Sequence, residues 1–385
     1  MMTTPGSEGR IEVEKVMNKE THSLIKLPPE ASPLVTYPLL FIAFVILMVV
    51  LNLLKSILIP FALAIFLAYI LYPVVNLLTR LKIPYGLAVA IVLLLFLCAF
   101  LAAGVLIGSE ISGFIQAIPQ YKEMLMENLN RLVSSYSNLV EKFATILPGE
   151  QGAKDTTQPA NSASSILSGI IGNIFTALLS VFSIVSDFVL VFFFLIFLLA
   201  GAKNFKKKLV SAWGSGEGGK AAEIIKSIND GIGGYIIIRT ALNLGLAIAI
   251  TIVLLIFGID YAYIWGPLAG ILNYIPYIGA FLALIPPVAI ALFQYDSYGT
   301  AIILLLIIVG IQNLEGNILT PLFIGKRVNQ NPLTILLGLI LWGFIWGPVG
   351  MILATPLTTC IQILCNNIEP LKPIGSLLGG DVKKK

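Results

Sequence analysis

The sequence predicts an all-α polytopic membrane protein with about seven or eight membrane helices or helix-hairpin elements. Only 11% of its 385 residues are charged and 57% are hydrophobic, whereas soluble domains carry about 25% charged residues. Uncharged apolar runs recur along the chain, and most reach the roughly 20 residues that a helix needs to cross the hydrocarbon core. These runs are 34–54, 56–79, 83–109, 188–202, 240–259, 261–295, 297–314 and 328–368.

Lysine and arginine placement predicts the orientation. Four segments are basic: the N-terminal tail, the turn with Arg80 and Lys82, the KNFKKK stretch at 203–208, and the C-terminal Lys383–Lys385. Because short cytoplasmic loops are rich in Lys and Arg, both termini are expected in the cytoplasm. The first thirty residues have no apolar region that could form a cleavable signal, so the first membrane helix is expected to target the chain. The net charge of +4 is spread over several loops and indicates cytoplasmic flanks, not a nucleic-acid partner.

Seven segments are expected along the chain. They are a cytoplasmic tail (1–33), three transmembrane helices (34–108), extracytoplasmic amphipathic helices with a linker (109–165), a fourth transmembrane helix (166–202), a cytoplasmic basic and amphipathic helix (203–239), a transport core with two broken hairpins (240–366), and a cytoplasmic tail (367–385).

Two runs in the transport core contain helix breakers. Run 261–295 is too long for one span and short for two spans with a loop, and Asn273, Pro276 and Gly279 lie near its centre. Run 328–368 is interrupted at Gly347-Pro348 and Gly350. If 261–295 crosses once, Lys326 and Arg327 fall outside; if both runs are re-entrant hairpins from opposite faces, every loop satisfies the charge rule. Interrupted segments of this kind mark the binding sites of transporters.

Glu315 follows eighteen uncharged residues and lies between the two broken runs. In an α-helix Gln312 lies about 60° from it, whereas Asn313, Asn317 and Thr320 form a polar stripe on roughly the opposite face. One interpretation is a helix between two polar surfaces, with Glu315 as a proton, cation or solute ligand, because an ionisable group within a span usually faces a cavity and pairs. The other is that the span ends before Glu315, which pairs with Lys326 or Arg327 at the surface.

These features predict a solute or ion pathway and no active site. The sequence has no HExxH motif, no nucleotide-binding glycine loop and a single histidine, so we expect no enzyme, catalytic residue, metal site or cofactor. The predicted pathway residues are Asn273, Pro276, Gly279, Gln312, Asn313, Glu315, Asn317, Thr320, Gly347, Pro348, Gly350 and Thr355.

Three stretches resemble the autoinducer-2 exporter family of bacterial membrane proteins. They are ILIPFALAIFLAYILYPVVNLLTR (57–80), YIPYIGAFLALIPP (274–287), and the segment from EGNILTP to GMILATPL (315–357). The matching motif positions are Pro276, Gly279, Pro286, Glu315, Gly316, Asn317, Pro321, Gly325, Pro332, Gly347, Gly350 and Pro356. The resemblance implies a multi-pass protein of the bacterial plasma membrane that forms a homo-oligomer, a pentamer being one option.

Three functions remain open at this level. The first is a secondary exporter of a small polar solute, such as autoinducer-2 or a related metabolite, that works by rigid-body, elevator-like alternating access. The second is a Na⁺ (or Li⁺)/H⁺ antiporter centred on Glu315. The third is a non-transporting membrane scaffold organised by region 109–165. The expected partners are the lipid bilayer, the small solute and, in the second case, H⁺ or Na⁺.

Overall fold

The computed structural model describes residues 33–146, 188–212, 227–295, 298–324, 330–367 and 371–380. It divides into two units, one ending at Leu54 and one beginning at Lys55. The first contains α2 (Pro33–Leu53), an apolar helix. Every regular element in the described ranges is helical, and five helices are long and apolar enough to cross a membrane. The predicted all-α polytopic class is therefore confirmed.

The second unit begins with a three-helix packing of α3 (Lys55–Arg80), α4 (Tyr85–Ile146) and α6 (Phe188–Ala212). Small and branched apolar side chains bury against one another between them, including Ala64, Val92 and Leu195. The Tyr85 hydroxyl donates a hydrogen bond of 2.6 Å to the Leu199 carbonyl and joins α4 to α6. The partner satisfies a polar group that would otherwise be unpaired in an apolar environment.

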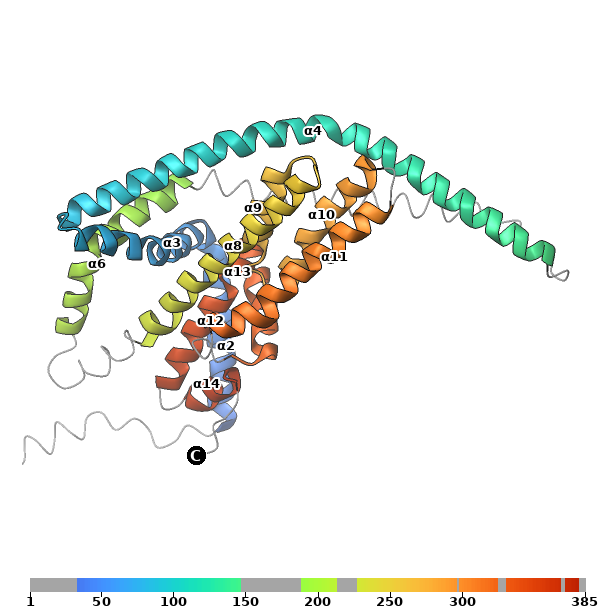
Figure 1. Ribbon diagram of the computed structural model, residues 1–385. Coiled ribbons are helices and arrows are strands. Elements are labelled where there is room, and N and C mark those ends of the chain that lie inside the picture. Colours follow the sequence, from blue (N-terminus) through green and yellow to red (C-terminus); the bar gives the residue numbers. More distant parts are fainter. Residues whose placement is uncertain are drawn as a thin grey trace, which may run out of the picture. The chain divides into compact units, whose positions relative to one another are not determined.

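Helix α4 passes without interruption through residue 109, where the sequence predicted a separate amphipathic region to begin. It contains 62 residues and is the long teal helix of Figure 1. At 1.5 Å per residue it is about 93 Å long, roughly three times the thickness of the hydrocarbon core. The expected linker at 151–165 and the first part of the expected helix at 166–202 lie outside the described residues.

The helix does not break at residue 240, where the transport core was expected to begin. A continuous helical segment from Asn229 to Ile256, long and apolar enough to cross a membrane, begins with the π-helix η1 (Asn229–Gly233) and continues into α8 (Gly234–Ile256). Arg239 therefore lies inside this candidate span. An uncharged-run criterion ends a span at any arginine, and it fails here because this arginine has a buried partner.

The first broken run forms a hairpin of two short helices, α9 (Ala262–Leu272) and α10 (Ile278–Gln294). Helix α9 runs antiparallel to α8: Gly266 packs against Thr251 and Ala247, and Gly270 packs against the Asn243 backbone. Figure 1 shows the two helices side by side. The turn after α9 therefore lies level with Asn243, close to the middle of the 28-residue span of α8.

The turn of this hairpin, 273–277, closes with an unusual backbone. Tyr277 has φ 64° and ψ −54°, and the Ile278 N–H donates to the Pro276 carbonyl at 2.7 Å. This i→i+2 bond around a positive-φ residue is the rare, strained form of the γ-turn, and such a conformation costs about 1–3 kcal/mol for a residue other than glycine. Gly279 follows, where a Cβ would overlap the Leu272 carbonyl, so the two arms can meet only at a glycine.

The chain then forms α11 (Tyr298–Leu314), the π-helix η2 (Glu315–Leu319) and α12 (Thr320–Ile324). The second broken run is α13 (Pro332–Asn367), whose helix reverses at Gly347 (φ 64°, ψ −145°). Its two arms lie antiparallel, because Gly338 meets Thr358 and a Cβ on Gly350 would overlap the Trp342 carbonyl. Helix α14 (Lys372–Leu378) packs on α13, and the Asn331 N–H donates to the Leu378 carbonyl.

Candidate functional site

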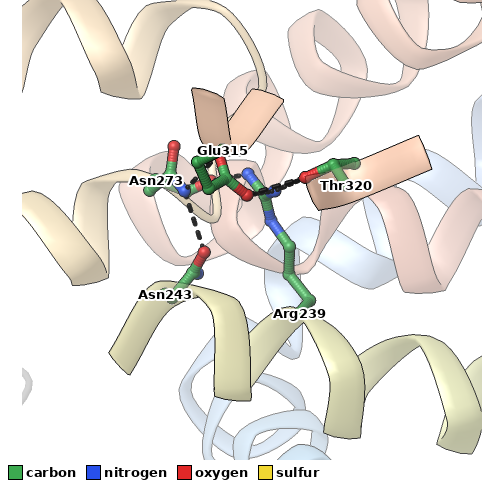
Figure 2. Close-up of polar contacts among 5 residues, drawn as sticks. All are labelled: Arg239, Asn243, Asn273, Glu315 and Thr320. Atoms are coloured by element: carbon green, nitrogen blue, oxygen red, sulfur yellow. Dashed lines mark hydrogen bonds and ion pairs between the residues drawn. The ribbon is translucent and has the colours of Figure 1, made fainter. Parts of the chain in front are cut away.

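A buried polar network lies where the turn of the first hairpin meets α8 and η2. It contains five residues from three parts of the chain: Arg239, Asn243, Asn273, Glu315 and Thr320. Figure 2 shows Arg239 and Asn243 rising from α8 toward the other three. Because Asn273 contacts α8 at Asn243, the network lies near the middle of the candidate span Asn229–Ile256.

Arg239 is the centre of this network. Its Nη1 donates to Glu315 Oε1 at 2.8 Å and to Thr320 Oγ1 at 3.2 Å, and its Nη2 donates to the Asn273 carbonyl. That carbonyl belongs to the residue that ends α9, so the guanidinium also satisfies a helix C-terminus. The Arg239 and Glu315 side chains are only 11% and 7% exposed. The two opposite charges thus neutralise each other away from solvent.

The π-helix η2 determines which side chain of its own segment forms a hydrogen bond with the Glu315 carboxylate. The Thr320 N–H bonds to the Glu315 carbonyl, five residues earlier, and the Thr320 hydroxyl donates to Glu315 Oε1 at 2.7 Å. The prediction that Thr320 lies on the opposite face from Glu315 is therefore wrong. It assumed about 100° per residue, which separates residues five apart by about 140°, whereas i→i+5 bonding brings them over one another.

Asn273 connects the hairpin turn to both sides of the network. Its Nδ2 donates to Asn243 Oδ1 at 2.9 Å and to Glu315 Oε2 at 3.2 Å. Asn243 is 3% exposed, and its own Nδ2 has no hydrogen-bond partner among the described residues. A buried amide donor without a partner is costly, and this nitrogen is left unsatisfied among the described residues.

Three further contacts hold the hairpin turn. The Tyr274 hydroxyl donates to Thr240 Oγ1 at 2.6 Å, and the Tyr274 ring meets the Phe66 ring edge-on at 5.4 Å. On the other side, Gln312 Nε2 donates to the Ala280 carbonyl at 3.0 Å. The turn is thus attached to α3, α8 and α11 at once.

The structure divides the predicted pathway residues into four groups. Asn273, Glu315 and Thr320 meet in the network, while Pro276, Gly279 and Gln312 build or hold the hairpin turn. Asn313 and Asn317 are exposed and bonded along their own helix, Asn313 to the Val309 carbonyl and Asn317 to Asn313. Gly347, Pro348 and Gly350 form the turn of the second hairpin, and Thr355 is buried in its returning arm.

Thr355 is 5% exposed, and its hydroxyl has no hydrogen-bond partner among the described residues. Tyr235, in the first turn of α8, is also buried. None of the described hydrogen bonds joins Thr355 to the network.

Sequence reasoning missed Arg239, Asn243 and Thr240. The available signal was the uncharged run that begins immediately after Arg239, with Asn243 one helical turn further on the same face. The predicted alternative partners of Glu315, Lys326 and Arg327, lie outside the described residues. Glu315 instead pairs with an arginine 76 residues earlier in the chain.

The network offers hydrogen-bond donors and acceptors but no set of metal ligands. Within the described ranges no three His, Cys, Asp or Glu side chains come together in a group that could hold a metal ion. What the arrangement can do is bind polar atoms, change partners and hold a hairpin in place. A helix break near the middle of a candidate span, a buried charge pair beside it and several apolar spans are features of a polytopic membrane transporter.

Comparison with known proteins identifies the family. Residues 39–369 match the AI-2E family transporters, so the chain belongs to that family. It is 29% identical over 279 residues to the AI-2 transport protein TqsA of Escherichia coli, which covers 72% of this chain and 76% of TqsA. It is 31% identical to a Haemophilus influenzae protein (71% of this chain, 76% of the relative) and 31% identical to Bacillus subtilis YueF (71% and 74%), both named as candidate transport proteins.

Proposed function

We propose that this protein is a secondary transporter that exports a small polar solute, AI-2 or a related signalling metabolite, across the bacterial plasma membrane. One observation carries the proposal: the turn of a helical hairpin meets a buried Arg239–Glu315 pair near the middle of a membrane span. An ionisable pair at this depth costs several kcal/mol, which favours a functional role over a purely structural one. The name of the relative TqsA supports AI-2 as the first solute to test.

The transport step that fits this arrangement is elevator-like movement of the hairpins against the rest of the unit. The first hairpin contacts α8 through side-chain hydrogen bonds that can exchange partners, such as Asn273 with Asn243 and Tyr274 with Thr240. A solute that offers hydroxyl and carbonyl oxygens supplies acceptors for the Asn243 amide and for donors released from Glu315. Binding of the solute would then change the free energy of one hairpin position relative to the other.

Cation/proton antiport at Glu315 is the second candidate, favoured by the burial of this carboxylate inside a membrane span. Arg239 argues against it, because the guanidinium occupies one carboxylate oxygen at 2.8 Å and neutralises the charge that a cation would need. A cation could bind only after Arg239 had moved away.

The cellular setting is part of the same proposal. The basic segments favour a cytoplasmic location for both termini by the positive-inside rule, and the similar Escherichia coli, Haemophilus influenzae and Bacillus subtilis proteins are bacterial. We place the chain in the plasma membrane as a homo-oligomer, consistent with the many exposed apolar side chains on the helix faces.

Efflux of AI-2 from proteoliposomes tests the proposal. Wild-type protein should release trapped AI-2, Glu315→Gln should reduce the rate at least tenfold, and Asn317→Leu should leave it near wild type because Asn317 bonds only along its own helix. Sodium-driven proton movement measured in the same vesicles, lost in Glu315→Gln, would instead support antiport. Wild-type vesicles that move neither AI-2 nor ions would favour the scaffold and contradict transport.

A further inference from the structure

The strained residue Tyr277 has a side chain that the fold does not use. It is 66% exposed, and it forms no hydrogen bond or ring contact with another residue of the described ranges. Its backbone nevertheless adopts a conformation that only glycine accepts without strain. Folding alone would therefore favour glycine at this position.

Four other described residues have positive φ: Gly258, Gly347, Lys82 and Tyr261. Tyr261 has ψ 31°, in the left-handed helical region where most non-glycine residues with positive φ are found, whereas Tyr277, with ψ −54°, lies outside that region. Gly347 forms the turn of the second hairpin, and at the corresponding turn of the first hairpin the chain carries a tyrosine. The strain is kept in place by the contacts on either side of it, from Asn273 and Tyr274 before it and from Ala280 after it.

The depth of the turn determines what the Tyr277 hydroxyl can face. Asn273 and Tyr274 contact α8 at Asn243 and Thr240, near the middle of the Asn229–Ile256 span. At half depth a phenol that pointed into acyl chains would leave its hydroxyl without a hydrogen-bond partner, and tyrosines in membranes concentrate at the interfaces for this reason. A tyrosine exposed at this level is stabilised where its hydroxyl meets water or a polar molecule.

From these observations we infer that Tyr277 lines the aqueous solute pathway at the turn of the first hairpin and contacts the transported solute directly. The inference rests on the proposed transport function and adds a specificity-determining residue to it. The phenol both donates and accepts a hydrogen bond, and its ring offers a flat apolar face. This chemistry fits a small solute that carries hydroxyl or carbonyl groups.

Thiol labelling tests the placement of Tyr277 without any solute. In a background with Cys98, Cys360 and Cys365 replaced by alanine, Tyr277→Cys should react with a permanently charged methanethiosulfonate reagent at least tenfold faster than Leu306→Cys. Leu306 is a matched control because it is 64% exposed in the middle of α11 and apolar. A membrane-permeant maleimide should label both thiols. Equally slow reaction of the two thiols with the charged reagent overturns the inference.

Two substitutions separate the role of the side chain from that of the strain. Tyr277→Gly and Tyr277→Ala both remove the ring, but only glycine relaxes the backbone, so Tyr277→Gly should melt several degrees higher than Tyr277→Ala while both lose AI-2 efflux. Tyr277→Phe should raise the KM for AI-2 roughly tenfold through one lost hydrogen bond. Tyr263→Phe, 56% exposed on α9, should not change the KM.

The outcomes distinguish this inference from the proposed function. If wild-type vesicles release AI-2 but Tyr277→Cys does not react and Tyr277→Phe has a normal KM, the pathway exists and Tyr277 is not part of it. If Tyr277→Cys reacts rapidly but wild-type vesicles release no AI-2, the placement of Tyr277 in an aqueous pathway is supported and AI-2 as the solute is wrong.

Discussion

At the scale of single residues, Arg239 and Glu315 hold three parts of the chain through one charge pair. Each side chain makes further hydrogen bonds, Arg239 to the Asn273 carbonyl and Glu315 to Thr320 and Asn273. A buried pair of this kind contributes little net stability compared with apolar residues, but loss of one partner leaves an uncompensated charge. The stability cost of burying either charged side chain therefore depends on the presence of the other.

This dependence predicts the result of a double-mutant cycle. Arg239→Gln alone should destabilise the protein by about 3–5 kcal/mol because Glu315 is left charged and unpaired. Arg239→Gln combined with Glu315→Gln should recover much of this loss. Thermal unfolding in detergent measures both effects. Losses that simply add would show that the two side chains do not interact.

Asn273 provides a second test at this scale, because its amide donates to Glu315 Oε2 at 3.2 Å. Asn273→Ala removes the donor and should cost about 1–3 kcal/mol. Asn273→Asp has nearly the same shape but places a second negative charge against Glu315, so it should be less stable than the alanine variant. A melting temperature for Asn273→Asp at or above that of Asn273→Ala would contradict the contact.

At the scale of secondary-structure elements, the π-helix η2 sets the register between Glu315 and Thr320. Five residues of π-helix cover about the same rotation as four residues of α-helix, so the same two side chains would meet after loss of one residue. The exposed Gly316 lies within η2, and a Cβ there would meet no atom within 4 Å.

Single-residue deletions test this register. Deletion of Gly316 should convert η2 to α-helix, keep Thr320 beside Glu315 and retain AI-2 efflux. Deletion of Leu305 in α11 should abolish efflux, because it rotates Glu315 by about 100° relative to the start of the helix. Equal loss in both variants, measured with matched protein amounts in vesicles, would contradict the role of η2.

Close contact between the arms of each hairpin gives another prediction for elements. A Cβ on Gly279 or Gly350 would overlap a carbonyl of the opposite arm. Each alanine substitution should therefore destabilise the protein by about 1–3 kcal/mol, the usual cost of overpacking. Gly310→Ala is the control: it has open space within α11 and should be neutral or stabilising by up to about 1 kcal/mol.

At the scale of the whole molecule, the two ends of the second hairpin should lie on the same side of the membrane. Helix α14 packs on α13, and the Leu378 carbonyl accepts from Asn331. Asn331→Cys and Ser376→Cys are both at exposed positions. Both thiols should react with an external impermeant maleimide in inverted vesicles, whose outer surface is the cytoplasmic one, and neither should react in right-side-out vesicles. Labelling of the two cysteines from opposite sides would mean that α13 crosses the membrane once.

Sequence reasoning predicted much of the fold but only part of the site. Charge depletion and apolar runs predicted the polytopic helical class, and the breakers at Pro276 and Gly347 fall at the observed helix breaks. The Arg239–Glu315 pair could not be derived, because long-range pairing leaves no local pattern when the partners are 76 residues apart. The position of Thr320 was wrong because a π-helix has no simple signature in residue types.

The separation of Arg239 from Glu315 along the chain also affects biosynthesis. The ribosome adds about 5–20 residues per second, so Arg239 emerges roughly 4–15 seconds before Glu315, given the separation of 76 residues. During this interval the nascent span of α8 contains an arginine that lacks its carboxylate, at a cost of about 2.5–3.5 kcal/mol on insertion scales. A polar setting around Arg239 would lower this cost until Glu315 arrives. We therefore expect the α8 segment to enter the membrane more slowly than a fully apolar helix of the same length.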